Sequence, residues 1–399
     1  MTAIAETESP LARLSEEQLE DLGREFDAIH DEVYEDLGDR DRRYIVAMIE
    51  LHRRLAVLAR VLLLGARFKP AWIAGTTANS MAKILENMEL GHNILHGQWD
   101  WMNDPQIHST SWDWDTASTS EAWKHSHNYV HHTYTNIRGK DRDLGYEIMR
   151  IDPHQRWHPV YLAQPLYNLL LMAFFEWGVA THDLDFEAIR SGEKPKEKVL
   201  EELKGMAGKA RTQITKDYIA WPLISGIAMT LIELGLITLK ARANGGERNP
   251  AVRATRTLRR FRRKQRGRRE VLRQLVERRS FQEPFRRTLT ADVAANINGG
   301  PFFHVMSGNL GYQVEHHLYP DMPSSRYGEI APRVREICKR YGLPYNSGPF
   351  HQQLGMVQRT ILRLGFPGGK PRPKPGAYEG PLRRGKGERP VEEQTAAAG

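Results

Sequence analysis

The chain of 399 residues contains a single cysteine, Cys338. One thiol excludes an intramolecular disulfide framework, and it excludes zinc or iron–sulfur clusters built from cysteines. The sequence also lacks an apolar run near Met1, so we expect no cleaved secretory signal and catalytic parts that face the cytoplasm. Histidine, by contrast, occurs 16 times. If this protein holds a metal ion, the expected ligands are therefore imidazole nitrogens.

Long hydrophobic runs are few. Hydrophobic residues make up 40% of the chain and charged residues 27%. This composition excludes a transporter packed with membrane spans, but it allows a few spans beside a large aqueous part. Four apolar stretches are candidate transmembrane helices, the first two of them as a hairpin: 55–66, 70–90, 160–180 and 218–239.

Positive charge is concentrated in one segment. The formal net charge is +8, and residues 242–287 alone hold 17 Lys or Arg against four Glu. Such a basic block beside an apolar stretch is typical of a segment that lies on anionic phospholipid headgroups. No recognition motif or interleaved aromatic residue accompanies it, so we expect membrane lipids and no nucleic acid as its partner.

The chain divides into three parts. Residues 1–45 are acidic and include a predicted amphipathic helix over 15–38, which begins at a capping box formed by Ser15 and Gln18. Residues 46–365 form the main domain, with the Arg-rich block 242–287 as an atypical insertion and two short helices predicted within 325–364. Residues 366–399 are rich in proline, glycine and charge, which predicts a disordered tail.

Nine histidines fall into three short clusters. His92 and His96 are four residues apart, so on a helix both imidazoles share one face and can reach one metal ion. The second cluster repeats this spacing and adds an adjacent histidine, and the third places a glutamine before a His-His step. The other candidate residues of these two clusters are His125, His127, His131, His132, His304, Gln313, His316 and His317.

So many imidazoles in so few residues point to metal binding. Neutral imidazoles in a core need polar partners and charged ones repel each other, so packing alone does not explain the clusters. A structural zinc ion is saturated by four ligands, which would leave several histidines in surplus. A two-metal site uses them, and a pair of irons is the choice that activates oxygen. Beside apolar stretches, such a site would oxidise a lipid-soluble substrate.

The order His-x3-His, His-x3-His-His and Gln-x2-His-His resembles the three histidine boxes of the integral-membrane fatty-acid desaturases. The surrounding residues are most similar to the actinobacterial stearoyl-CoA Δ9 type, and the similarity extends from about residue 43 to residue 350. The resemblance implies an all-α fold, in which an integral-membrane helical bundle of the cytoplasmic membrane carries a cytoplasmic, histidine-rich diiron cap. It also implies insertion of a cis double bond into a saturated acyl chain, held as acyl-CoA or as an acyl lipid, at the expense of O2 and two electrons.

The resemblance implies that the electrons come from NAD(P)H. Since this chain has no Gly-rich dinucleotide loop, we expect a separate reductase or a ferredoxin-type donor to deliver them. The ligands implied by the resemblance are His92, His96, His127, His131, His132, His316 and His317, with His125 and His304 as further candidates. Five side chains near the clusters are candidates for orienting the ligating imidazoles: Gln313, Asp100, Asp104, Asp143 and Glu315. The tryptophans after the first cluster, Trp99, Trp101, Trp112 and Trp114, either line an acyl tunnel or form an interfacial belt.

One departure from the family pattern leaves alternatives open. Relatives have a further hydrophobic span before the third box, where this chain carries the Arg-rich block. The same iron pair also serves hydroxylases and ketolases, which are one alternative. The other is a membrane protein that has kept the boxes and lost its activity.

Overall fold

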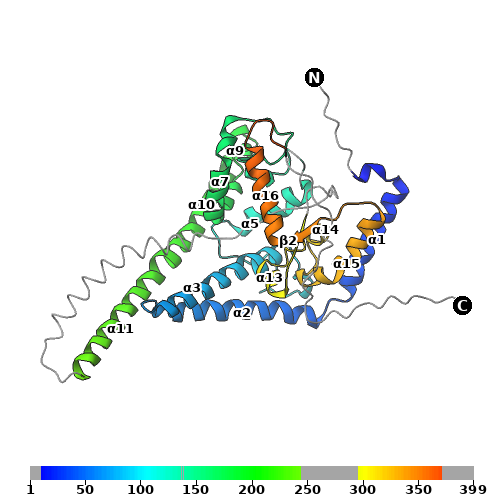
Figure 1. Ribbon diagram of the computed structural model, residues 1–399. Coiled ribbons are helices and arrows are strands. Elements are labelled where there is room, and N and C mark those ends of the chain that lie inside the picture. The colour runs from blue at the N-terminus through cyan, green and yellow to red at the C-terminus, as the bar shows by residue number, and fades with distance from the viewer. Residues whose placement is uncertain (1–9, 136, 138, 244–294, 371–399) are drawn as a thin grey trace.

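The computed structural model of the chain describes residues 10–135, 137, 139–243 and 295–370. Nearly all of the Arg-rich block 242–287 and most of the tail 366–399 lie outside these residues. The described part is mostly helical, as predicted (Figure 1). A small departure from an all-α fold is one parallel pair of three-residue strands, β1 (Asn296–Asn298) and β2 (Ser347–Pro349).

The N-terminal helix α1 (Glu16–Glu35) begins at the predicted capping box. The Ser15 side chain accepts a hydrogen bond from the backbone of Gln18, whose own side chain accepts one from the backbone of Ser15. The buried face of α1 packs against α15 (Tyr327–Arg340), which follows the third histidine cluster. Helix α1 therefore covers the outer side of the third histidine cluster.

Helices α2 (Asp39–Leu64) and α3 (Lys69–Ile84) form an antiparallel hairpin, the arm that extends sideways in Figure 1. Helix α3 continues into η2 (Leu85–His92) and α4 (Asn93–Leu95), which carry the first cluster. At the start of α2, the buried Asp41 carboxylate accepts two hydrogen bonds of 2.7 Å from Arg326. The hairpin is thereby fixed to the segment that follows the third cluster.

The second cluster lies on three consecutive helical segments, α5 (Ser120–Trp123), η4 (Lys124–His131) and α6 (His132–Tyr134). The predicted span 160–180 is not one helix. It comprises η6 (Pro159–Ala163), α7 (Gln164–Ala173) and α8 (Phe175–His182), and it is interrupted at Phe174. Helices of ten and eight residues are each too short to cross a bilayer core, so the prediction of a single span here is wrong.

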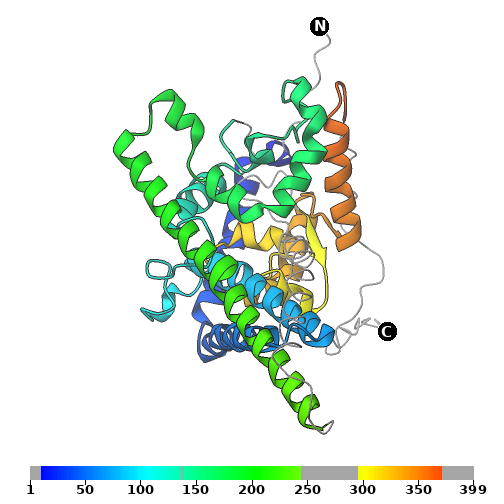
Figure 2. The ribbon, with the colours of Figure 1, turned by 90° about the vertical axis from the view of Figure 1, so that its left-hand side faces the viewer.

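The segments α10 (Lys196–Gln213), η7 (Ile214–Ala220) and α11 (Trp221–Ala243) follow one another without a break and run diagonally across the molecule in Figure 2. Within the described residues, Lys196–Lys240 is the one helical stretch long and apolar enough to cross a membrane. Only 6% of its most apolar 18-residue segment is buried inside the protein. Of the four predicted spans, only 218–239 lies inside this stretch.

The third cluster lies on α13 (Pro301–Met306) and α14 (Gln313–Leu318), and α16 (Phe350–Leu364) follows β2. The two predicted helices within 325–364 are therefore present as α15 and α16. The remaining short helical segments are η1 (Pro10–Arg13), η3 (Asp100–Met102), η5 (Leu144–Glu147), η6 (Pro159–Ala163), α9 (Phe186–Ser191) and η8 (Ser324–Arg326).

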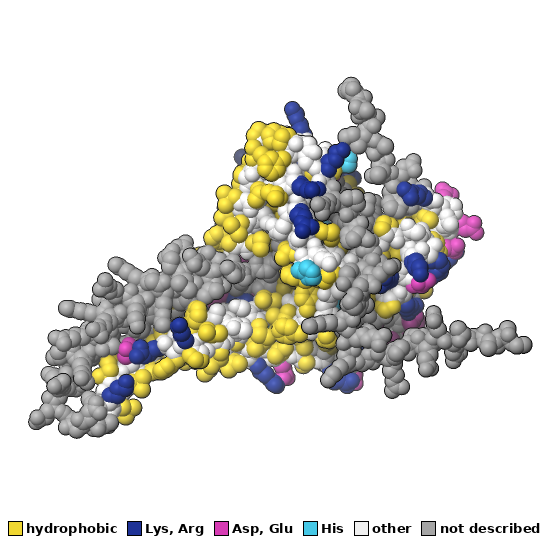
Figure 3. Space-filling view, in the orientation of Figure 1, with side chains coloured by type: hydrophobic (Ala, Val, Ile, Leu, Met, Phe, Trp, Pro, Cys, Tyr) yellow, Lys and Arg dark blue, Asp and Glu magenta, His cyan; other side chains and the backbone are white. Residues whose placement is uncertain are grey.

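Exposed apolar side chains gather on the hairpin, on α7 and on α11. Figure 3 shows hydrophobic areas over the hairpin and α7. The exposed side chains include Val57, Val61, Ile73, Leu166, Leu169, Leu223, Ile227 and Leu231. Water disfavours apolar surface on this scale, which marks these elements as a surface for a lipid or protein environment.

Candidate metal centre

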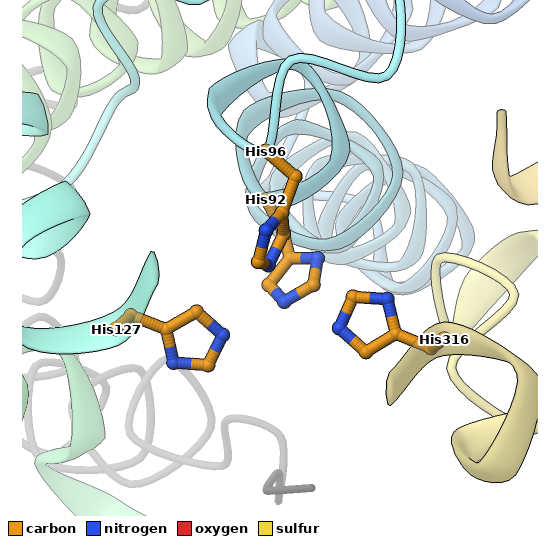
Figure 4. A group of neighbouring side chains, drawn as sticks. All are labelled: His92, His96, His127 and His316. Carbon is orange, nitrogen blue, oxygen red and sulfur yellow. The ribbon is translucent and has the colours of Figure 1, made fainter. Parts of the chain in front are cut away.

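Seven histidines from the three clusters converge in two neighbouring groups. His92, His96, His127 and His316 form the first, which we call the four-histidine group, and His131, His132 and His317 form the three-histidine group. Within each group, one ligand nitrogen from every residue lies within 4.8 Å of the others. Figure 4 shows the first group, whose rings point toward a common centre from three separate elements. Each group has the donor number and spacing of a metal site.

Two of the supporting segments, η2 and η4, are π-helices that end at or beside a ligand. Such segments are rare and occur frequently at functional sites. His92 and His96 belong to the same group, as their spacing predicts. His127 and His131 have the same spacing, and their rings stack with centroids 5.2 Å apart, but they belong to different groups.

The first and third clusters are held together by close backbone contact. Gly308 has a φ of +65°, and a Cβ atom at this position would lie 2.4 Å from the Met88 carbonyl oxygen of η2. Only glycine fits both the conformation and the space. The neighbouring Asn309 donates to the fully buried Glu89 of η2, which also accepts hydrogen bonds from Tyr44 and Ser324. This arrangement places His316 beside His92.

In the four-histidine group, neutral side chains hold two of the imidazoles. Nδ1 of His92 lies 3.0 Å from Oδ1 of Asn93, whose amide donates to the carbonyl of Gly308 over 3.1 Å. Nδ1 of His316 lies 3.2 Å from the hydroxyl of Tyr327. With Nδ1 held in this way, the opposite side of each imidazole ring faces the four-histidine group, and the orientation of the ring is fixed.

In the three-histidine group, the support includes a carboxylate. Nδ1 of His131 lies 3.0 Å from Oδ1 of the buried Asp141, and Nε2 of His317 lies 3.1 Å from Oε1 of Gln313. His132 is also buried, and neither of its ring nitrogens has a hydrogen-bond partner among the described residues. A buried imidazole without hydrogen bonds is costly, and a metal ion would satisfy it.

Asp143 contacts one histidine of each group. Its Oδ2 lies 3.5 Å from Nδ1 of His127 and 3.7 Å from Nδ1 of His131, while its Oδ1 lies 3.0 Å from Nε2 of His182. Burial alone would raise the pKa of Asp143, but hydrogen bonds from His127 and His182 and the charge of His131 hold it well below the ordinary value. The carboxylate is therefore ionised and can orient both rings.

One imidazole of each group, that of His92 and that of His132, is in the neutral form that binds metal. Burial lowers the pKa of His92 from its ordinary value near 6.5 to about 3, with a further contribution from His127. Burial and the surrounding histidines lower the pKa of His132 well below its ordinary value. Neutral imidazole is the ligand form, so the donor set fits two metal ions of the iron, zinc or copper type.

The structure does not bring every candidate to this centre. His125 is exposed and stacks on Tyr129, and the ring of His304 stacks on Tyr312 with centroids 4.3 Å apart. Neither belongs to the two groups. Of the five side chains predicted to orient imidazoles, Gln313 and Asp143 contact ligands.

The other three make their contacts elsewhere. Asp100 accepts from Ser109 over 2.7 and 2.6 Å. Asp104 accepts from the Gln106 backbone over 2.9 Å and lies 3.8 Å from Arg42. Glu315 accepts from Tyr345 and Asn296, and its pKa is raised to about 7 by burial.

Asn93, Asp141 and Tyr327 contact candidate ligands but were not predicted from the sequence, and neither was His182, which contacts Asp143. Asn93 lies inside the first cluster, and Asp141 lies two residues before Asp143, so proximity could have suggested both. His182 and Tyr327 come from distant elements without a motif, and only the fold places them here.

A cavity adjoins the four-histidine group. His92 and His127 line one wall, and apolar side chains of η2, α5 and α8 line part of the rest, among them Met88, Trp123, Phe175 and Val179. Charged side chains, among them Lys83, Glu176 and Asp183, also line the cavity. Trp114 lines it as well, whereas Trp99 is fully buried in the core beneath the first cluster. The apolar part of this wall, beside two candidate metal ligands, can hold a hydrocarbon chain.

Comparisons with known proteins agree with this geometry. The family model described as fatty acid desaturase matches residues 70–232 and 280–349. The NADPH-dependent stearoyl-CoA 9-desaturase of Mycobacterium tuberculosis is 41% identical over 369 residues, which cover 89% of this chain and 82% of that protein. Human fatty acid desaturase 3 is 36% identical over 85 residues, 21% of this chain and 19% of that protein. No solved structure matches the chain significantly.

Proposed function

The chain belongs to the fatty acid desaturase family, and on that premise we propose that it inserts a cis double bond into a saturated acyl chain. The substrate is an acyl-CoA of the stearoyl type, the position is Δ9, and the oxidant is O2. Two electrons come from NAD(P)H through a separate reductase or a ferredoxin-type donor. The name of the mycobacterial relative supports both the substrate class and the origin of the electrons.

One observation carries the proposal. Seven imidazoles from three clusters, which together span residues 92–317, meet in two groups, each within 4.8 Å, beside a cavity with an apolar wall. The two groups suit a pair of iron ions, which would be held by His92, His96, His127 and His316 and by His131, His132 and His317. When bound, the irons would supply the power to take hydrogen from an unactivated methylene, which acids and bases cannot supply.

The chain's own residues have three tasks in this reaction. The apolar cavity wall of Met88, Phe175 and Val179 would hold the alkyl chain and exclude water from it. The neutral, buried imidazoles would hold the metal without adding negative charge. Asp141 and Asp143 would fix the tautomer and direction of His131 and His127, because a carboxylate at one ring nitrogen leaves the other for the metal.

We also propose a position at the cytoplasmic membrane, with the histidines on the cytoplasmic side. The apolar stretch within Lys196–Lys240 and the exposed apolar faces of the hairpin and α7 support contact with lipid. The basic block 242–287 follows that stretch directly in the sequence and would lie on the same side as the histidines.

The assembled donor set favours an active enzyme over a protein that has lost its activity. All seven expected ligands are present and grouped within the described residues, although the family's usual span before the third box is replaced by the basic block. The hydroxylase and ketolase alternatives use the same centre, so product analysis separates them.

Expression in a cell that lacks its own stearoyl desaturase, followed by fatty-acid profiling, tests the proposal. We expect a Δ9 monounsaturated product from the wild-type chain and none from His132→Ala. His125→Ala is the matched control, because His125 belongs to the same sequence cluster, on the segment η4 directly before His132, and lies outside both groups. A hydroxylated product would favour the alternative oxygenase, and no product despite supplied donor and bound metal would contradict the proposal.

A further inference from the structure

The C-terminal end of α8 contacts the second cluster through two adjacent residues. Asp183, which caps α8, accepts a hydrogen bond of 2.5 Å from Ser126 of η4 and another from Ser118. His182, the last residue of α8, is buried, and its Nε2 lies 3.0 Å from Oδ1 of Asp143. The end of α8 is thus fixed to the ligand-bearing segment directly and to its supporting carboxylate.

This contact continues to the metal ligands. The other oxygen of Asp143 lies 3.5 Å from Nδ1 of His127, in the four-histidine group, and 3.7 Å from Nδ1 of His131, in the three-histidine group. Asp143 is the carboxylate that contacts both groups, and His182 occupies its remaining oxygen. A single side chain on α8 therefore determines where this shared carboxylate points.

We propose that His182 is a positioning residue of the metal centre, which acts through Asp143 to orient His127 and His131. The inference rests on the proposed metal-dependent function and adds a residue outside the three histidine clusters. It assigns α8 a task in the chemistry, although the sequence marks this helix only by its apolar character.

The charges around His182 suit this task. Burial lowers its pKa, but the hydrogen bond and charge of Asp143, with the nearby Asp183, outweigh burial and the opposing charge of Arg142, so that the net pKa is raised. Arg142 donates to the His182 carbonyl over 3.0 Å, and the Tyr146 ring lies 5.4 Å from the imidazole. A protonated His182 would balance the buried negative charge of Asp143, which would otherwise be costly to keep ionised.

A purely structural role for His182 makes a different prediction. If the ring only filled space in the cavity wall, a side chain of similar size would replace it, and the metal environment would stay the same. If it positions Asp143, loss of its nitrogen should change the ligand field even in a protein that folds well.

Cobalt(II) binding to the purified, chelator-treated full chain distinguishes these two roles of His182 without catalytic turnover. The titration would use wild type, His182→Phe, His182→Gln and Asp143→Asn. His154→Phe is the control, because His154 is exposed and contacts Asp152 instead of the metal centre. Visible absorption bands report the ligand field, titration reports affinity, and thermal unfolding reports stability.

We expect His182→Phe to weaken cobalt binding by up to the roughly 10- to 100-fold expected for Asp143→Asn, which removes the direct partner of the candidate ligands. Its absorption bands should shift toward those of Asp143→Asn. His182→Gln keeps a hydrogen-bond donor, so its cobalt affinity and its absorption bands should be close to those of the wild type. If His182→Phe does not fold, His182→Gln carries the test, and values between wild type and Asp143→Asn would support the proposal.

Wild-type bands and affinity in His182→Phe would overturn the inference, even if its unfolding temperature fell. Wild-type values in Asp143→Asn would overturn it as well, since His182 acts through that carboxylate. Failure of the wild-type chain itself to bind cobalt would instead contradict the metal centre and the proposed function.

Discussion

The two histidine groups differ in what holds their rings. In the four-histidine group, His92 and His316 contact an amide and a phenol, whereas in the three-histidine group His131 contacts the carboxylate of Asp141. Asp143 adds a second carboxylate, which supports one ring in each group, His127 over 3.5 Å and His131 over 3.7 Å. The three-histidine group therefore differs by Asp141, a carboxylate that it does not share with the other group.

For the proposed metal centre, this difference predicts two positions that are not equivalent. A carboxylate at the second nitrogen makes an imidazole a stronger donor, while a neutral partner only orients it. One ion would be held by three imidazoles with carboxylate support, and the other by four imidazoles with mostly neutral support. Two similar ions can thus have distinct environments. The comparison predicts which substitutions are most harmful and in which group.

Removal of a ligand should have the largest effect. His316→Ala in the four-histidine group and His132→Ala in the three-histidine group should each reduce desaturation to background, because each leaves one metal position short of a donor. Metal analysis should show the loss of bound metal in both variants while circular dichroism stays helical. Full activity in either variant would contradict its assignment as a ligand, and His125→Ala should behave as wild type.

Removal of a supporting carboxylate should have the next largest effect. Asp141→Asn and Asp143→Asn should lower metal affinity or activity by about 10- to 100-fold, with Asp141→Asn acting on the three-histidine group alone. The measurement is metal titration of the chelator-treated protein. Equal loss from both groups in Asp141→Asn would show that the carboxylate support is not confined to one side.

Removal of a neutral support should have a smaller effect on the metal. Tyr327→Phe takes the hydroxyl from His316 and also from the Tyr319 carbonyl, so we expect a cost in stability of about 1–3 kcal/mol. The loss in metal affinity should stay below that of Asp141→Asn, because a neutral hydrogen bond is roughly half as strong as a charged one. Denaturant unfolding and metal titration, measured on the same samples, separate the two effects.

The response of the metal-free protein to acid should be the smallest effect and should be similar for both groups. Burial lowers the pKa of His92 and of His132, one in each group. The unfolded chain then binds protons that the folded chain does not, so the free energy of unfolding falls as pH drops below about 6.5. Between pH 7 and pH 6 the loss should be about 0.7 kcal/mol for each histidine.

Chelator-treated His92→Gln and His132→Gln should each flatten this pH dependence by a similar amount in denaturant unfolding. A flattening confined to one of them would show that the groups differ in burial as well as in carboxylate support.

Local sequence patterns predicted much of the centre and part of the fold. The capping box at Ser15, the helices of 325–364 and the seven clustered histidines follow from short-range spacing, and the structure contains all of them. The division of the histidines into two groups does not follow from spacing. His127 and His131 share the interval of His92 and His96, but their segment is a π-helix, and they face different groups.

The contacts that hold the rings were harder to predict, because they depend on tertiary packing. His182 reaches Asp143 only because the apolar run 160–180 breaks at Phe174 and places a short helix against η4. Hydropathy predicted one span there, since an apolar average does not reveal a break in the backbone. Tyr327 reaches His316 through the docking of α15, which no local motif indicates.

Mössbauer spectroscopy of the purified full chain loaded with 57Fe, together with metal analysis, tests the central claim most directly. The account predicts two irons per chain, one for each histidine group, and two quadrupole doublets of equal area with different parameters. His132→Ala should lose one doublet, and His125→Ala should keep both. A single iron per chain, or two irons that give one indistinguishable doublet, would contradict two inequivalent positions built from these seven histidines.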